Sequence, residues 1–267
     1  MTRATTAIAI AICATLLVGC GEVGTDTSAK TRMHIPDTTT AAPPKKPSAS
    51  HSPAETGPPE KANRSRARKK PLGPHGSMRF TDSRAVALTF DDGPSPHWTP
   101  KVLALLKKAH VKATFCIIGQ EARRHPKLVR AIVRAGHTLC NHSWAHDMDL
   151  GARSDRSITS NLLDTNAAIR EAAPAAEIKY YRQPGGQWTA RLVRVAKSLG
   201  MRPLHWDVDP QDWRRPPAGH ISHTVIRHTK QGSIVLLHDG GGDRSTTYWA
   251  LQRILPNLTR RFQLVRL

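Results

Sequence analysis

The sequence lacks an apolar run long enough to cross a bilayer. The apolar run near its N-terminus, from Ala7 to Val18, is shorter than the ~20 residues that a membrane-spanning helix needs. The run follows Arg3 and ends in Leu17-Val18-Gly19-Cys20, so it is typical of an export signal rather than of a spanning helix. The sequence also contains no internal repeat, which argues against a solenoid or a propeller.

Acidic residues are scarce. The chain has 40 Lys and Arg residues against 20 Asp and Glu residues, a formal net charge of +20. This balance suggests an anionic partner, which could be a nucleic acid, an anionic lipid or an acidic cell wall. Because an exported protein rarely meets nucleic acid as a substrate, we expect no nucleic-acid partner. Part of the excess lies in one ten-residue tract that contains Lys61, Arg64, Arg66, Arg68, Lys69 and Lys70.

Cysteines are few, and each of the four has a separate interpretation. Cys13 lies inside the export signal. Cys20 follows small residues at the end of the apolar run, which resembles the bacterial lipobox and predicts a lipid-anchored protein on the outer face of the cell membrane; the alternative is an ordinary signal peptide that contains Cys20. Cys116 and Cys140 remain. In an oxidising compartment they could form a disulfide if their Cα atoms come within ~7 Å, or they could be two small buried apolar residues.

Large apolar residues are almost absent between the signal and residue 78. The segment is rich in Thr, Pro, Ala, Ser and Lys, so it cannot bury enough surface to offset the entropy of ordering. We therefore predict a signal peptide at 1–19, a disordered tether at 20–78 and one catalytic domain at 79–267. The basic end of the tether either binds anionic wall polymer or lipid headgroups, or is a solvated linker. A monomer is expected for a tethered domain of this size.

Beyond residue 84, short apolar runs alternate with helical patterns. Buried strands are predicted at 85–90, 113–118, 137–140, 179–182, 203–208, 233–237 and 262–265. Helices are predicted between them, from Thr99 through Leu106 and at 126–135, 158–172, 189–199, 221–228 and 248–258. Strands that alternate with helices indicate βα units, so the fold class is α/β with a parallel sheet or barrel.

Residues suited to metal-assisted hydrolysis follow the predicted strands. Two adjacent acids and a His-x-x-x-His pair can supply one carboxylate and two imidazoles to a divalent metal, with positions left open for water and substrate. The second carboxylate could act as a base, and a further histidine as an acid. On a helical turn, the two histidines of the pair would share one face. Each of these residue patterns alone often has a purely structural role. The chance occurrence of all of them in one chain, each after a predicted strand, is far less frequent. The residues are Asp91, Asp92, His142, His146 and His238.

Five segments resemble, in order, the five motifs of the polysaccharide deacetylases (carbohydrate esterase family 4, the NodB-homology domain). They begin at Thr89, Asn141, Arg182, Asp209 and Leu236, and the resemblance covers residues from about 83 to 267. It implies an irregular (β/α) barrel and the metal-dependent removal of acetyl groups from a polysaccharide. In the terms of that family, Asp91 is the base, while Asp92, His142 and His146 bind the metal, with zinc expected and cobalt possible.

The resemblance also implies supporting roles around this centre. Arg182 would hold Asp91 ionised, and Asp212 would keep the general acid His238 protonated. Substrate would meet the backbone N–H of Gly185, the Trp213 wall and the Leu236 methyl pocket. Many relatives carry an aromatic residue where Gly185 stands, so Trp188 or Trp144 is expected to replace that wall. Trp144, Trp188 and Trp206 could stack on sugars, and Trp206 is expected to be core.

Three classes of function are compatible with these residues. The first is a deacetylase, acting on N-acetylglucosamine in peptidoglycan, on chitooligosaccharides or on acetylated xylan. The second is a non-catalytic wall-binding lipoprotein with the same fold. The third is a basic surface-binding lipoprotein in which residues 61–70 carry the function. The presence of both Asp91 and His238 favours the enzyme.

Overall fold

The computed structural model describes residues 70–267. The predicted signal, Cys20 and the tether up to residue 69 lie outside these residues. Within residues 70–267, none of the helices combines the length and the apolar character needed to cross a membrane.

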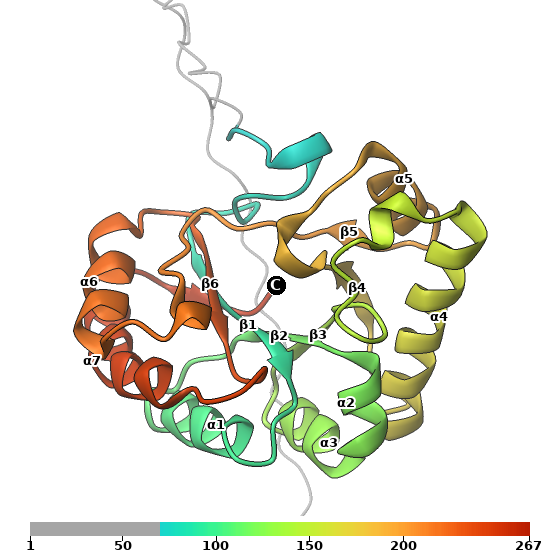
Figure 1. Cartoon of the computed structure of the whole chain (residues 1–267). Helices are drawn as coiled ribbons and strands as arrows, with labels where there is room; N and C mark the ends of the chain where they lie inside the picture. The colour runs from blue at the N-terminus through green and yellow to red at the C-terminus, as the bar shows by residue number, and fades with distance from the viewer. Residues whose placement is uncertain (1–69) are drawn as a thin grey trace, which may run out of the picture. The chain divides into compact units, whose positions relative to one another are not determined.

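Seven strands form one curved parallel sheet (Figure 1). Their order is β5-β4-β3-β2-β1-β6, and β7 pairs with the start of β1. The central strands β1, β2 and β6 are buried along almost their whole length because both faces of the sheet are covered there, as in other parallel sheets. The strands are β1 (Val86–Gly93), β2 (Thr114–Ile117), β3 (Thr138–Asn141), β4 (Ile178–Tyr181), β5 (Arg202–Pro203), β6 (Ile234–His238) and β7 (Leu264–Val265).

The predicted irregular barrel is confirmed, and its irregularity lies between β5 and β6. These strands do not pair with each other. The chain before β1 fills the gap, with Met78 bridging to Leu204 and Phe80 bridging to Ser233. Met78 is buried in the barrel interior. The predicted tether boundary at residue 78 is therefore too late, because residues 70–78 pack on the domain and Met78 supplies part of its core.

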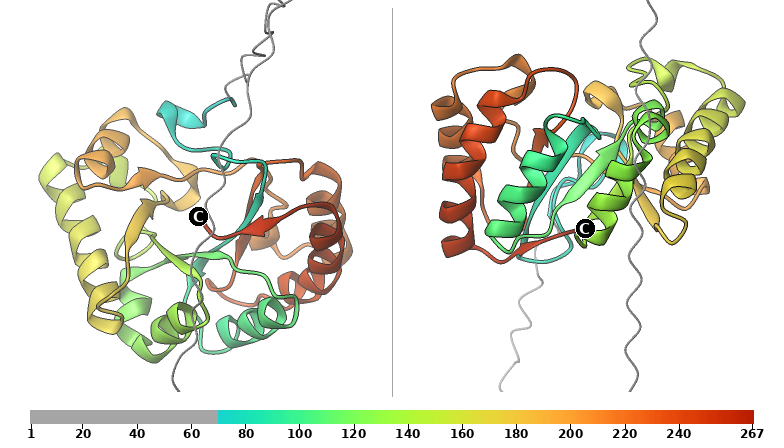
Figure 2. Two further views of the ribbon diagram at one scale, coloured as in Figure 1. Left: turned by 180° about the vertical axis from the view of Figure 1, so that it is seen from behind. Right: turned by 90° about the horizontal axis from the view of Figure 1, so that it is seen from below.

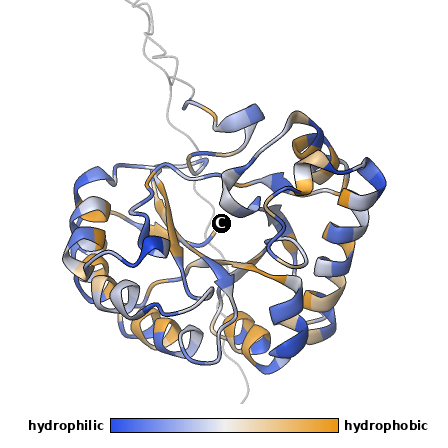
Figure 3. Cartoon of the chain, in the orientation of Figure 1, coloured by the Kyte–Doolittle hydropathy of each residue, from blue (hydrophilic) through white to orange (hydrophobic). Residues whose placement is uncertain are grey.

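In the described part of the chain, seven α-helices surround the sheet (Figure 2). The predicted helices are confirmed, but α4, α6 and α7 each begin three residues earlier than predicted, and Ser154 caps α4. Only α2 was not predicted, since its six residues are too few for an apolar stripe to show. Figure 3 shows apolar residues along the strands and on the helix sides that face them. The helices are α1 (Thr99–Lys108), α2 (Gly119–Arg124), α3 (Pro126–Arg134), α4 (Asp155–Ala172), α5 (Ala190–Ser198), α6 (Ala218–His228) and α7 (Ser245–Arg261).

A disulfide joins β2 to β3 inside the barrel. Cys116 and Cys140 are paired across the two parallel strands, with Cα atoms 4.2 Å apart. The predicted pairing is therefore present in the structure. Both cysteines belong to the buried cluster that contains Met78 and Leu204, so the bond links the two central strands within the core.

Candidate active site

The carboxyl ends of the parallel strands meet at one side of the barrel, where they surround a cavity of about 380 Å³. Side chains from β1 and β6, and from the loops that follow β3, β4, β5 and β6, are far apart in sequence but close in space. Such an edge is where α/β folds place their sites. The cavity is lined by Asp91, Asp92, His142, His146, Met148, Gln183, Gly185, Trp206, Asp209, Trp213, Leu236, His238 and Arg244.

The end of β1 presents two adjacent acids to the same cavity. Successive residues of a regular strand point to opposite faces, so a regular β1 could offer only one of them. Here the pairing with β2 shifts register between Asp91 and Gly93, and Asp92 has a φ of 70°. This local irregularity turns both carboxylates toward the cavity, which agrees with the frequent placement of bulges beside active sites.

His142 and His146 meet through a loop rather than through a helical turn, so the expectation of a shared helix face is wrong. The loop after β3 contains two non-glycine residues with positive φ, Ser143 at 64° and His146 at 59°. Asn141 accepts a hydrogen bond from the Ser143 N–H, which fixes the start of the loop. The two imidazole rings lie 5.3 Å apart between centroids.

Asp92, His142 and His146 fit a divalent metal. One ligand atom from each lies within 4.8 Å of the others, and both Nε2 atoms are 3.3 Å from Asp92 Oδ1. That oxygen is buried and receives no well-aligned hydrogen bond from residues 70–267. The His142 Nδ1 lies 2.8 Å from the Arg182 carbonyl, so a proton on Nδ1 leaves Nε2 free as a ligand.

Electrostatics support the same assignment. Burial favours the neutral form of Asp92, but the close His142 side chain and the charges of His238, His142 and His146 hold the pKa of Asp92 well below its ordinary value. Burial lowers the pKa of His146, which favours the neutral imidazole that metals bind. The cluster thus offers one carboxylate and two imidazoles, the donor set of many catalytic zinc sites.

Arg182 fixes the other acid of β1. Its guanidinium is fully buried, and Nη1 lies 2.7 Å from Asp91 Oδ1 and 2.8 Å from Thr89 Oγ1. The remaining nitrogens donate to the carbonyls of Leu204 and His205. Asp91 therefore keeps one oxygen bound to Arg182, while its Oδ2 lies toward His142 at 3.7 Å.

Asp212 holds His238, which pairs with Asp91 across the neighbouring strands β1 and β6. Asp212 Oδ1 lies 2.7 Å from His238 Nδ1, and Asp212 Oδ2 accepts hydrogen bonds from the His238 N–H and from Thr247 Oγ1. Burial opposes the charged imidazole, but the Asp212 carboxylate outweighs it, together with Asp92 and Asp91, and raises the pKa of His238 to about 9. His238 is thus a protonated acid at neutral pH, with Nε2 as the ring nitrogen that Asp212 leaves free.

The expected substrate-facing residues are only partly those that line the cavity. Gly185, Trp213 and Leu236 do line it. Trp188 does not, because it is buried against Tyr181 and donates its indole N–H toward His205. Trp144 also lies away from the cavity, half-buried beneath Arg123.

The missing aromatic wall is replaced by residues from two other loops. A Cβ on Gly185 would lie 2.7 Å from Met148 Cε, so Met148 occupies the space beside this glycine. Trp206 is half-buried and lines the cavity, which corrects the expectation that it is core. It fits there because the facing residue is Gly186, where a Cβ would lie 2.7 Å from its ring.

Sequence reasoning did not single out Met148, Gln183, Asp209 or Arg244 as site residues. Gln183 and Asp209 lie inside the segments already identified, so position alone could have suggested them. Arg244 carries no such signal. It is buried at the start of α7 and donates to the carbonyls of Gly240 and Gly241, which braces the loop after β6.

Comparisons with known proteins identify the family. The family model described as polysaccharide deacetylase matches residues 79–204. A chitooligosaccharide deacetylase of Sinorhizobium fredii is 39% identical over 70% of this chain and 91% of its own length. A peptidoglycan-N-acetylglucosamine deacetylase of Bacillus cereus is 36% identical over 72% of this chain and 92% of its own length.

Solved structures agree with these relatives. A family 4 carbohydrate esterase of Streptomyces lividans, in complex with acetate, superposes with a TM-score of 0.62 at 33% identity, covering 70% of this chain and 92% of that one. A family 4 pseudoenzyme of Bacillus anthracis superposes with a TM-score of 0.66 at 27% identity, covering 71% of this chain and 66% of that one. The fold alone therefore does not establish activity, and the residues of the site must.

Proposed function

Because this chain belongs to the polysaccharide deacetylase family of hydrolases, we propose that it removes the acetyl group from N-acetylglucosamine units of peptidoglycan, with zinc as its metal. The observation that carries the proposal is the complete catalytic set around one cavity. A base candidate, an acid candidate and a three-residue metal cluster all face it. Each has a partner that fixes its protonation or orientation.

The first proton transfer is assigned to Asp91. Its Oδ1 is held by Arg182 at 2.7 Å, so Oδ2 is the oxygen left to accept a proton from the attacking water. A zinc ion held by Asp92, His142 and His146 would supply Lewis-acid polarisation and lower the pKa of water. Water is the nucleophile, so no covalent acyl-enzyme forms.

The second proton transfer is assigned to His238. Asp212 holds its Nδ1, which leaves the Nε2 proton for the departing sugar nitrogen. The Gly185 N–H lines the cavity and donates to no acceptor within residues 70–267, so it can stabilise the developing oxyanion. Leu236 would receive the acetyl methyl group, and Trp213 and Trp206 would pack on the sugar.

Chitooligosaccharides are the nearest alternative substrate, since they contain the same acetamido group and are named for one relative. O-acetylated xylan is a third, in which the bond is an ester. We favour peptidoglycan because of the relative named for it and because a chain with a net charge of +20 would be attracted to an anionic wall. No feature of the described residues favours the non-catalytic wall-binding function.

We further propose that the protein is exported and lipidated at Cys20, with its domain on the outer face of the membrane as a monomer. The sequence pattern around Cys20 supports this location. Metabolic labelling with a fatty-acid analogue tests it: the wild-type chain should take up the label, and the Cys20→Ala chain should not.

The activity test compares substrates. Acetate release by the full chain carrying Cys20→Ala would be measured on peptidoglycan, on chitooligosaccharides and on acetylated xylan. The proposal predicts release from both N-acetylglucosamine glycans, with peptidoglycan preferred. Release from xylan alone would refute amide hydrolysis, and a preference for chitooligosaccharides would refute the choice of substrate while leaving the mechanism intact.

A further inference from the structure

The side of the barrel opposite the cavity is basic. In a parallel sheet all strands begin at the same side, so the loops before β1, β2 and β6 lie there together with the chain after β7. Each supplies an exposed cation: Arg84, Lys112, Lys230 and Arg266. Lys230 lies 3.7 Å from Asp207 Oδ2, and the other three form no ion pair within residues 70–267. Arg266 and Lys112 converge on the same turn, donating to the carbonyls of Gly136 and Ala135. We call these four residues the strand-start cations.

The helices add to the same charge. In a βα fold each helix runs back against its strands, so its last turn lies at the side where strands begin. Six helices, α1, α3, α4, α5, α6 and α7, carry a Lys or Arg in that turn.

The helix dipole favours cations at helix C-termini, and this is the simplest structural explanation. The same effect should place acids in the first turns. Five of the same six helices have none there, and Asp155 in α4 is the exception. The helix dipole therefore does not explain why the last turns are basic while the first turns lack acids. It also does not explain the cations in the loops.

Three of the acids on this side have a cation partner, whereas Glu171, exposed in the last turn of α4, forms no ion pair within residues 70–267. Glu177 pairs with Lys179, and Asp82 pairs with Arg202 at 2.7 Å. Asp207 is nearly buried and lies 3.3 Å from Arg79 and 3.7 Å from Lys230. The catalytic side, by contrast, carries Asp91, Asp92, Asp209 and Asp212. The catalytic cavity thus has a cluster of four carboxylates, whereas exposed cations with few acids between them lie on the opposite side of the barrel.

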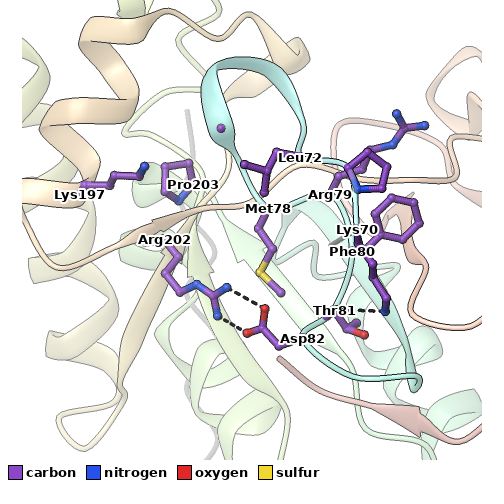
Figure 4. Close-up of a pocket in the computed structure, with 12 residues that line it drawn as sticks. Lys70, Leu72, Met78, Arg79, Phe80, Thr81, Asp82, Lys197, Arg202 and Pro203 are labelled. Carbon is purple, nitrogen blue, oxygen red and sulfur yellow. Dashed lines mark hydrogen bonds and ion pairs between the residues drawn. The ribbon is translucent and has the colours of Figure 1, made fainter. Parts of the chain in front are cut away.

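An apolar groove adjoins this basic side (Figure 4). Its volume is about 660 Å³, and it lies between the segment 70–82, the end of α5 and β5. Its lining combines Leu72, Met78, Phe80 and Pro203 with the cations Lys70 and Lys197. Leu72 is 67% exposed, one of the most exposed large apolar residues among residues 70–267. Apolar surface between cations suits a lipid interface, where a side chain enters beneath the headgroups, better than it suits a hydrophilic polyanion.

Lys70 also marks where the rest of the chain joins the domain. Its Nζ contacts the carbonyls of Thr81 and Ser83, just before β1 begins, so residues 61–69 with their further cations connect at this side. The N-terminal segment thus joins the domain on the side that carries the cations and the exposed Leu72.

We propose that the strand-start side of the domain docks on a bilayer that contains anionic lipid, with the strand-start cations on the headgroups and Leu72 inserted beside them. In this orientation the catalytic cavity points away from the membrane. The inference goes beyond the proposed function and does not depend on it, because docking is measured as binding and not as hydrolysis.

Two variants with the same net charge separate a specific face from general charge. The full chain carrying Cys20→Ala removes the lipid anchor and keeps the basic tract 61–70 in every sample. The test variant adds R84Q, K112Q, K230Q and R266Q. The control variant adds K101Q, R123Q, K127Q and R156Q, which neutralises four exposed cations on the catalytic side. Co-sedimentation would measure binding to vesicles of phosphatidylcholine with and without phosphatidylglycerol.

We expect binding only to the anionic vesicles, at least about tenfold weaker binding for the test variant, and little change for the control. Leu72→Gln should weaken vesicle binding without changing binding to soluble polyphosphate. Thermal unfolding and acetate release from a soluble oligomer should be unchanged in the test variant.

Three outcomes would overturn the proposal. An equal loss of vesicle binding in the test and control variants would mean that only the net charge of the chain matters. No loss in the test variant would place all binding in the tract 61–70. Tighter binding to polyphosphate than to vesicles, with no effect of Leu72→Gln, would mean that the partner is a wall polyanion and not a bilayer.

Discussion

Replacing Asp212 with Asn should move the alkaline limit of activity. Asp212 contacts His238 through both carboxylate oxygens, and the pKa of His238 is raised to about 9 as a result. The difference from the ordinary value of about 6.5 corresponds to about 3 kcal/mol in favour of the charged imidazole. Asn keeps the shape of Asp212 but removes its charge, while the burial that opposes the charged form remains. The pKa should therefore fall to about 6.5 or below.

The sign follows from the role of His238 as an acid. Activity needs the protonated ring, so it is retained below the pKa and lost as pH rises through it. Wild-type kcat/KM should decline near pH 9, and that of Asp212→Asn near pH 6.5. At pH 8 the variant should be at least about thirtyfold slower, and the deficit should shrink as the pH falls below 6.5.

The assay is acetate release from a soluble N-acetylglucosamine oligomer between pH 5 and 10, at saturating zinc. Asp243→Asn is the matched control, because Asp243 is an exposed acid of the loop after β6 that makes no contact with His238. Its alkaline limit should stay near that of the wild type. An Asp212→Asn profile that keeps the wild-type limit, or that falls by the same factor at every pH, would refute the assignment of His238 as an acid tuned by Asp212.

Three further predictions concern other parts of the domain. Replacing both Cys116 and Cys140 with Ala should lower the free energy of unfolding by about 3 kcal/mol, since the bond closes a loop of 24 residues; urea unfolding measures it. Trp213→Ala should raise KM severalfold with a smaller change in kcat, because Trp213 lines the cavity. Trp188→Phe should leave KM unchanged, because Trp188 does not line it; steady-state kinetics distinguish the two variants. His146→Gln should weaken zinc binding by at least about tenfold, measured by competition with a chromogenic chelator, because it removes one of three ligands.

The order of strands and helices could be predicted because buried strands and amphipathic helices have different periods. The catalytic residues could be located because they follow strands, and the parallel arrangement brings strand ends together. The geometry of the metal cluster could not be predicted from the sequence. It depends on positive φ at Asp92, Ser143 and His146, which no periodicity predicts in non-glycine residues.

Two errors have a common physical origin. The strand predicted before the fourth motif, 203–208, is only two residues long as β5, because the chain then leaves the sheet and places Trp206 in the cavity. Residues 70–78 were assigned to the tether because their composition is polar, yet Met78 fills the gap that the short β5 leaves beside β6. Both follow from incomplete closure of the barrel, which is a property of the whole sheet and not of any local segment.

The most direct test of the central claim is acetate release by the full chain from an N-acetylglucosamine oligomer after chelation and again after zinc addition, with Asp91→Asn measured in parallel. We predict that chelation abolishes release, that zinc restores it in the wild type, and that Asp91→Asn binds zinc equally well but is slower by a factor of about 10² to 10⁴. Release that survives chelation, or an Asp91→Asn chain as active as the wild type, would contradict the proposed metal-dependent mechanism with Asp91 as its base.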